Sequence, residues 1–486
     1  MPPQVLLIVF VASTPSLPTY VQFLSVALSS NILNPSAMAW TSGKEPARSL
    51  HLHCMVRLLS GKYTAMPIEN NFQHDEMLRK NPGDRVTYRE LSGAAAPDSP
   101  SWQAAMGAVG SHLSRSGVRL VMFLHGSVLG TDVFGLTRLD EAGGLKRGYS
   151  RGISGLDSLL AFMREGPNGI GPLPGGLMPP LPDDEATKKL LDDQVGDAAN
   201  FTTAYVESFR KATNQKAAPP LICVRELWSG ENHHLGRAIA ACRVLERVYR
   251  LVAEHALGAT DRILVEGHGQ AGLVLALVSN LLCPSPMTGR KKLFEILRSH
   301  SQQTALPDLD RILDRIEAAL TSKSLLNGAA LDIVTFGTPV RYGWDPSGIG
   351  KLLHVVNHRN LRTDGKTWLS KMELPQITME MPIAWGGDYV QELAVAGTDA
   401  MPASESAREA NKAVWELVEP YDGFERWVEC ARRAVRCPTE GSCLLVDYKD
   451  CTGSTNARDH YFGHAAYTRM DAMLFNHTEI VGRLYS

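Results

Sequence analysis

The sequence predicts an α/β fold in which helices cover both faces of a mostly parallel central sheet. Short apolar runs recur from Val118 onward, and segments with helical periodicity separate them. Runs that are apolar throughout, rather than alternating with polar residues, are typical of parallel strands buried on both faces. The length of 486 residues favours two domains or one large domain with insertions.

The composition is that of an ordinary globular protein, with 44% hydrophobic and 21% charged residues and a formal net charge of -2. Because no basic excess is present, we expect no nucleic-acid partner, and no acidic excess indicates disorder. The sequence also has no P-loop, internal repeat or heptad run. We therefore expect no cofactor, and the oligomeric state stays open.

The eight cysteines are too few for a disulfide scaffold in a chain of this length. Four of them fall in one short window, at Cys430, Cys437, Cys443 and Cys451, without the C-x-x-C pair that favours zinc. We interpret them as unpaired thiols in a reducing compartment, which favours a cytoplasmic location. The histidines at positions 51, 53, 233 and 234 lack metal-ligand spacing, so we expect no metal site.

Residues 1–100 are treated as a separate N-terminal region. No charged residue precedes Lys44, and the apolar run Val5–Ala12 is too short to span a bilayer. Three interpretations stay open: a weak export signal, a disordered tail, or a start upstream of the natural one, with the last two favoured. Residues 44–92 are polar and irregular, and residues 93–100 read as a linker. No later segment has the length expected of a transmembrane helix.

Residues 101–486 carry the regular pattern. Ser101 is expected to cap a helix over Trp102–Ser114, and Val118–Leu124 to form the first buried strand. The stretch 140–215 contains a Gly/Pro-rich zone flanked by helix-like pieces, and we interpret it as an insertion or lid over the core. A second, charged helical insertion is expected at 284–328.

The other expected elements follow the same apolar and helical periodicity. The remaining strands are expected at 220–227, 263–265, 331–336, 353–357, 392–396 and 443–447. The remaining helices are expected at 235–255, 273–283, 309–320 and about 467–475.

The central strand leads into a glycine-dense turn and then an apolar helix. The turn reads Gly267-His268-Gly269-Gln270-Ala271-Gly272. Strand, sharp turn and buried helix form the context of the G-x-S-x-G nucleophile elbow, whose flanking glycines allow strand and helix to approach closely. In this chain the apex position of that elbow is Gly269.

Polar residues follow several of the other strands. His125-Gly126-Ser127 comes directly after one strand, Gly337-Thr338-Pro339 after another, and Asp399 and His464 lie further along the chain. Because ligand sites of open parallel sheets lie at the carboxyl ends of the strands, we expect these residues to line one crevice.

These motifs together resemble the α/β-hydrolase family, of the lipase/esterase kind. The resemblance covers roughly 118–485, and the order elbow, acid, histidine is the family's order. It implies that His464 is the general base and that Asp399 orients it. It also implies an oxyanion hole from backbone N–H groups near Ser127 and at Gln270. His460 competes with His464 as base, and Asp388 competes with Asp399 as acid.

The departure from the family is Gly269, because glycine has no atom that could attack a carbonyl. Losing the nucleophile of a triad costs on the order of 10⁶ in turnover. Two hypotheses follow: an acyl-ester hydrolase of reduced activity, or a catalytically silent relative that binds a small hydrophobic or acyl ligand or a partner. Ser127 and Ser229 are speculative replacement nucleophiles.

Gly267, Gly269 and Gly272 also fit the dinucleotide pattern G-x-G-x-x-G, but the acidic residue expected after the next strand is missing.

Overall fold

The fold is an α/β structure built on a seven-stranded sheet, all of whose described strand pairs are parallel. The computed structural model describes residues 85–91, 95–126, 185–284, 288–304, 307–358, 387–388, 390–391, 402, 404–418, 437–438, 440–448 and 463–486. The strand order is β1-β7-β6-β5-β4-β2-β3. The fold class predicted from the sequence is confirmed.

The strands that make up this sheet are short and mostly apolar. They are β1 (Val86–Glu90), β2 (Val118–Leu124), β3 (Ile222–Glu226), β4 (Arg262–His268), β5 (Ala330–Phe336), β6 (Leu352–Asn357) and β7 (Ser442–Asp447). Successive side chains of a strand point to opposite faces. In β2, Met122 therefore enters the core on one face and Phe123 the core on the other.

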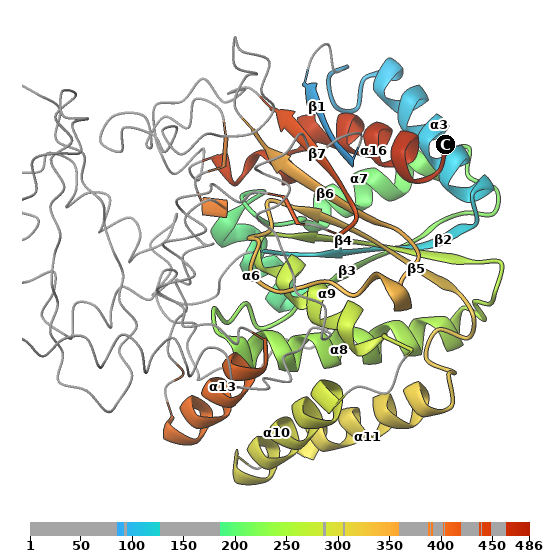
Figure 1. Cartoon of the computed structure of the whole chain (residues 1–486). Helices are drawn as coiled ribbons and strands as arrows, with labels where there is room; N and C mark the ends of the chain where they lie inside the picture. Colours follow the sequence, from blue (N-terminus) through green and yellow to red (C-terminus); the bar gives the residue numbers. More distant parts are fainter. Residues whose placement is uncertain are drawn as a thin grey trace, which may run out of the picture.

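Helices cover both faces of the sheet (Figure 1). One face carries α3 (Pro100–Arg115), α7 (Thr203–Thr213) and α16 (Met470–Leu484). The other carries α8 (His234–Glu254) and α9 (Gln270–Leu281), and an outer group of helices packs against α8: α10 (Thr288–Thr304), α11 (Pro307–Thr321) and α13 (Glu405–Val418). Within the described ranges, no helix combines the length and apolar character needed to cross a bilayer.

Helix starts differ slightly from the expected positions because other residues cap them. Ser99, rather than Ser101, caps α3, and its hydroxyl accepts the N–H of Trp102 at 3.3 Å. His233 caps α8, and its Nδ1 accepts the N–H of Gly236 at 2.9 Å. Such caps satisfy backbone donors that have no partner inside the helix.

Strand β1 is the main departure from the expected layout, since residues 44–92 were expected to be irregular. Val86–Glu90 instead pairs in parallel with β7, with Val86 opposite Cys443 and Glu90 opposite Asp447. The strand is short, and only one of its residues is buried. The sheet therefore extends into the N-terminal region that was treated as separate.

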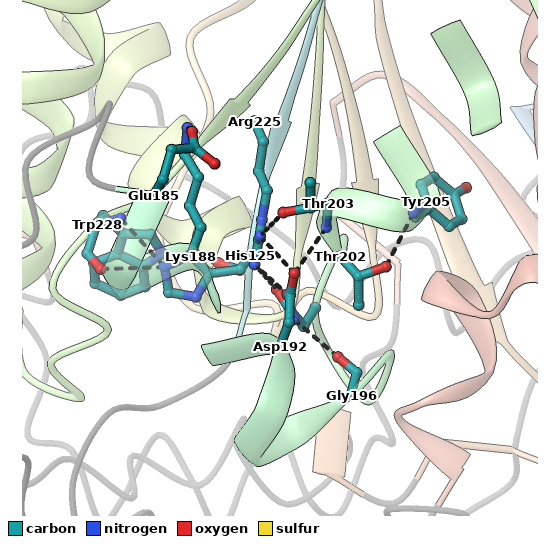
Figure 2. Close-up of polar contacts among 11 residues, drawn as sticks. His125, Glu185, Lys188, Asp192, Gly196, Thr202, Thr203, Tyr205, Arg225 and Trp228 are labelled. Atoms are coloured by element: carbon teal, nitrogen blue, oxygen red, sulfur yellow. Dashed lines mark hydrogen bonds and ion pairs between the residues drawn. The ribbon is translucent and has the colours of Figure 1, made fainter. Parts of the chain in front are cut away.

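A buried arginine on the edge strand β3 connects this strand to two helices that precede it in the chain. Arg225 of β3 donates to both carboxylate oxygens of Asp192, at 2.6 and 3.0 Å (Figure 2). Asp192 belongs to α6 (Glu185–Val195), and Arg225 also donates to Asn200 and to Thr203 at the start of α7. Bidentate Arg–carboxylate pairs fix geometry as well as energy. The clamp holds α6 and α7 against the sheet edge.

Candidate functional site

The turn between β4 and α9 has the backbone of a strained tight bend. Gly269 has φ 51° and ψ -117°, values that match the first central position of a type II′ turn and favour glycine. Its N–H donates to the carbonyl of Phe336 at 2.7 Å, and its carbonyl accepts the Thr338 hydroxyl at 2.9 Å. The bend is therefore tied to the end of the neighbouring strand β5.

The other glycines of the turn lie where strand, helix and loop touch. A Cβ on Gly272 would collide with the Thr338 side chain, and one on Gly267 would stand 2.7 Å from Cδ1 of Leu275. A Cβ on Gly126, at the end of β2, would collide with His268. These contacts explain why small residues occupy the positions that the elbow pattern predicts.

His464 reaches the elbow from the opposite end of the chain. Its Nδ1 lies 2.7 Å from Oδ2 of Asp388, and both side chains are buried. Because a carboxylate only accepts hydrogen bonds, Nδ1 carries the proton and Nε2 is left with the lone pair when the ring is neutral. This is the arrangement by which an acid orients an imidazole base.

Asp388 is held by further donors. The Tyr467 hydroxyl donates to Oδ2 at 2.8 Å, and the Gln391 N–H donates to Oδ1 at 2.8 Å. The Tyr467 oxygen in turn accepts the N–H of Asn357, at the end of β6, at 2.7 Å. The acid is thus connected through hydrogen bonds to the edge of the sheet where the parallel strands end.

The side chain of Asn357 joins the two loops that supply acid and base. Its Nδ2 lies 2.9 Å from the carbonyl of Gly463 and 3.3 Å from that of Gly387. Gly463 precedes His464, and Gly387 precedes Asp388. One amide therefore sets the spacing of the imidazole and the carboxylate.

Nε2 of His464 faces the apex of the elbow. It lies 2.7 Å from the position that a Cβ on Gly269 would occupy, and Cε1 lies 3.3 Å from that position. Cα of Gly126 is 3.8 Å from the same point. The imidazole thus fills the volume that a side chain at the apex would need.

His268 packs against this ring and is fully buried. Its Nε2 donates to the His464 carbonyl at 2.8 Å, and the two ring centroids are 4.3 Å apart. Burial first, and then repulsion from His464, lower the pKa of His268 well below its usual range. His268 is therefore neutral, and its Nδ1 has no hydrogen-bond partner in the described part of the chain.

Only part of the expected oxyanion hole lies within the described residues. Ser127 lies outside the described residues, while the N–H of Gly126 donates to the carbonyl of Ala199 at 2.9 Å. Gln270 is the first residue of α9, where backbone N–H groups lack intrahelical acceptors. Its side chain is engaged with the buried Arg237 at 3.1 Å and with Asn232 at 2.8 Å.

His125 packs into the interior next to β3. Its carbonyl accepts the indole N–H of Trp228 at 2.8 Å, and its Nε2 lies 3.1 Å from the Trp228 carbonyl (Figure 2). The imidazole and indole rings are stacked. His125 therefore connects the segment after β2 to the segment after β3.

Some of the residues singled out from the sequence lie outside the described part of the chain, and others have contacts that the sequence did not predict. Asp399 and His460 lie outside the described residues. The carboxylate that contacts His464 is Asp388, the competing acid of the sequence analysis. Ser229 donates to Glu231 at 3.1 Å, and His234 lies 2.7 Å from the hydroxyl of Tyr342. Among the described residues, no three metal-binding side chains gather into a site.

Four residues around the site have no role predicted from the sequence: Tyr467, Asn357, Gln391 and Arg237. Tyr467 follows His464 by three residues, and Asn357 ends a predicted strand, but neither belongs to a motif. Arg237 is the most informative of the four, because it is fully buried and still linked to Gln270 of the elbow. An arginine on the apolar face of a predicted helix is the signal that could have found it.

No protein-family model, curated protein or solved structure matches this chain. The parallel sheet and its flanking helices are consistent with an α/β-hydrolase without being specific to that family.

Proposed function

We propose that this chain is a catalytically silent relative of lipase/esterase-type α/β-hydrolases, which holds a small hydrophobic or acyl ligand near the elbow. The observation that carries the proposal is the short distance of 2.7 Å between Nε2 of His464 and the point where a Cβ on Gly269 would stand. The acid–base pair of His464 and Asp388 supports the hydrolase ancestry. The missing side chain at the apex supports the loss of acyl transfer.

The test compares ester turnover by the native chain and by its His464→Ala variant, using esters of short and long acyl chains. The proposal predicts the same rate for both, because no acyl-enzyme forms through position 269. A native rate clearly above that of His464→Ala would contradict it.

Ligand binding is tested separately, with a medium-chain fatty acid and its methyl ester as probes. A ligand that binds only the folded state raises the melting temperature as its concentration rises. We expect such a shift for the native chain and a smaller one for Gln270→Ala, which alters the elbow while leaving His464 in place. Unchanged melting at every concentration would contradict an acyl ligand.

The second candidate, a hydrolase of reduced activity, is favoured by one observation: Nδ1 of His464 keeps its carboxylate partner and Nε2 still faces the elbow. Gly269→Ser separates the two candidates, with Gly269→Ala as its matched control. Ester turnover in the serine variant alone would mean that only the nucleophile was lost.

A further inference from the structure

Two cysteines near the start of β7 have their sulfur atoms in contact. Sγ of Cys443 is 3.0 Å from Sγ of Cys437, and both residues are buried. Non-bonded carbon atoms make their best contacts at about 3.5–4.0 Å, and sulfur is the larger atom. The two sulfur atoms are thus closer than simple packing requires.

We propose that Cys437 and Cys443 are an oxidisable pair whose two sulfur atoms join in a disulfide next to the start of β7. A disulfide has its sulfur atoms about 2.05 Å apart, so closure moves them together by about 1 Å. The proposal concerns the far edge of the sheet and is independent of the proposed function at the elbow.

The start of β7, which carries Cys443, is held in place from both sides. Gly441 has φ +69°, and a Cβ there would lie 2.6 Å from Cγ of Leu352 on β6. Nε of Arg85 donates to the Gly441 carbonyl at 2.9 Å from the start of β1. Cys443 itself is paired with Val86 of β1 and His354 of β6. The neighbouring strands therefore fix the position of Cys443.

The oxidant that we assign is a low-molecular-weight disulfide such as oxidised glutathione. One protein thiolate attacks this disulfide, forms a mixed disulfide and releases one small thiol. The second protein thiolate then attacks the protein sulfur of the mixed disulfide and releases the second small thiol. Two protein thiols are oxidised to one disulfide and one small disulfide is reduced to two thiols, with the protons passing to the released thiolates.

Two other cysteines provide internal controls. Burial raises the pKa of Cys242 and that of Cys223 to about 12, so both stay protonated at neutral pH. Among the described residues, the thiol in contact with Cys443 is that of Cys437, and neither Cys223 nor Cys242 takes part in this contact. No three metal-binding side chains gather among the described residues.

The test incubates the full chain in mixtures of reduced and oxidised glutathione, quenches it in acid and blocks free thiols with N-ethylmaleimide under denaturing conditions. Cleavage by trypsin after Arg436 and Lys449 and by a glutamyl endopeptidase after Glu440 separates the cysteines into peptides 437–440 and 441–449. We expect these two peptides joined, with a mass lower by two hydrogen atoms than their sum.

Cys437→Ser should abolish this cross-linked pair and leave Cys443 either blocked by the maleimide or joined to one glutathione, whereas Cys242→Ser should leave the cross-link unchanged. The proposal is overturned if both cysteines of the oxidised native chain are fully blocked. It is also overturned if either is joined to Cys430 or Cys451 instead. Because the native digest decides the question alone, a Cys437→Ser variant that fails to fold does not weaken the test.

Discussion

Nε2 of His464 lies 2.7 Å from the point where a Cβ on Gly269 would stand. A base and an elbow from distant parts of the sequence are thus brought together, yet at a distance that leaves no room for the side chain that the base would activate. The imidazole stands where the side chain of a serine at position 269 would begin, so its position goes together with the glycine at the apex. Any side chain introduced at the apex must displace the ring.

The first prediction concerns that displacement. Gly269→Ala and Gly269→Ser should each lower the free energy of unfolding by about 1–3 kcal/mol, the usual cost of a strained backbone position, with collision against His464 adding to it. The two losses should be similar, because both variants share the Cβ that collides. Urea denaturation measures them, and unchanged stability in both variants would mean that His464 does not fill this volume.

The second prediction concerns the carboxylate behind the imidazole. Asp388 accepts hydrogen bonds from His464, Tyr467 and the Gln391 N–H. Asp388→Asn should cost about 1.5–3 kcal/mol, as expected for bonds to a charged group. Tyr467→Phe is the matched control and should cost about 1–3 kcal/mol, because it leaves the buried N–H of Asn357 without its acceptor. Equal native and Asp388→Asn midpoints in urea would be incompatible with this network.

The third prediction follows from the lowered pKa of His268. The unfolded state takes up a proton near pH 6.5, whereas the buried ring in the folded state does not. Stability should therefore fall as pH drops below about 6.5, by at most about 1.4 kcal/mol per pH unit for this one group. In His268→Gln, which can still donate to the His464 carbonyl, the loss between pH 6.5 and 5 should be smaller. An equally steep loss in the variant would refute this assignment.

The fourth prediction concerns His477 of α16, whose Nε2 lies 3.0 Å from Glu266 of β4. Burial alone would lower the pKa of His477, but attraction to Glu266 and hydrogen bonds to Glu266 and Met473 raise it overall. A raised folded pKa contributes stability that is fully present below about pH 6.5 and is lost as pH rises through the folded pKa. The native chain should thus lose stability relative to His477→Gln as pH rises above 6.5. If the free energies of unfolding of the native chain and of His477→Gln change equally with pH, a protonated His477 in the folded state is excluded.

Much of the fold could be predicted because its strands are local apolar runs. Val118–Leu124 was predicted with the bounds that β2 has, and the bounds of most other strands differ by a few residues. Strand β1 was missed because Val86–Glu90 is short and mixed in polarity, and only its pairing with the distant β7 makes it a strand. Edge strands of this kind carry little signal in their own sequence.

The site could be predicted only in part. The elbow is a contiguous motif, so the sequence alone identifies Gly269 and its glycine neighbours, and the family resemblance implies His464 as the base with His460 as its competitor. The choice between Asp388 and Asp399 depends on the path of the chain between β6 and α13, which no local pattern encodes. Asp388 is in contact with the imidazole, and the position of Asp399 is not described.

The central claim is that the native chain has no nucleophile aligned with His464. A covalent probe that reacts with activated serines, followed by intact-mass measurement, tests it most directly, with a known serine esterase as the positive control. We predict that the mass of the native chain is unchanged after exposure to the probe, as is that of His464→Ala. Labelling of the native chain that disappears in His464→Ala would contradict the account, and the modified peptide would identify the serine that acts in place of Gly269.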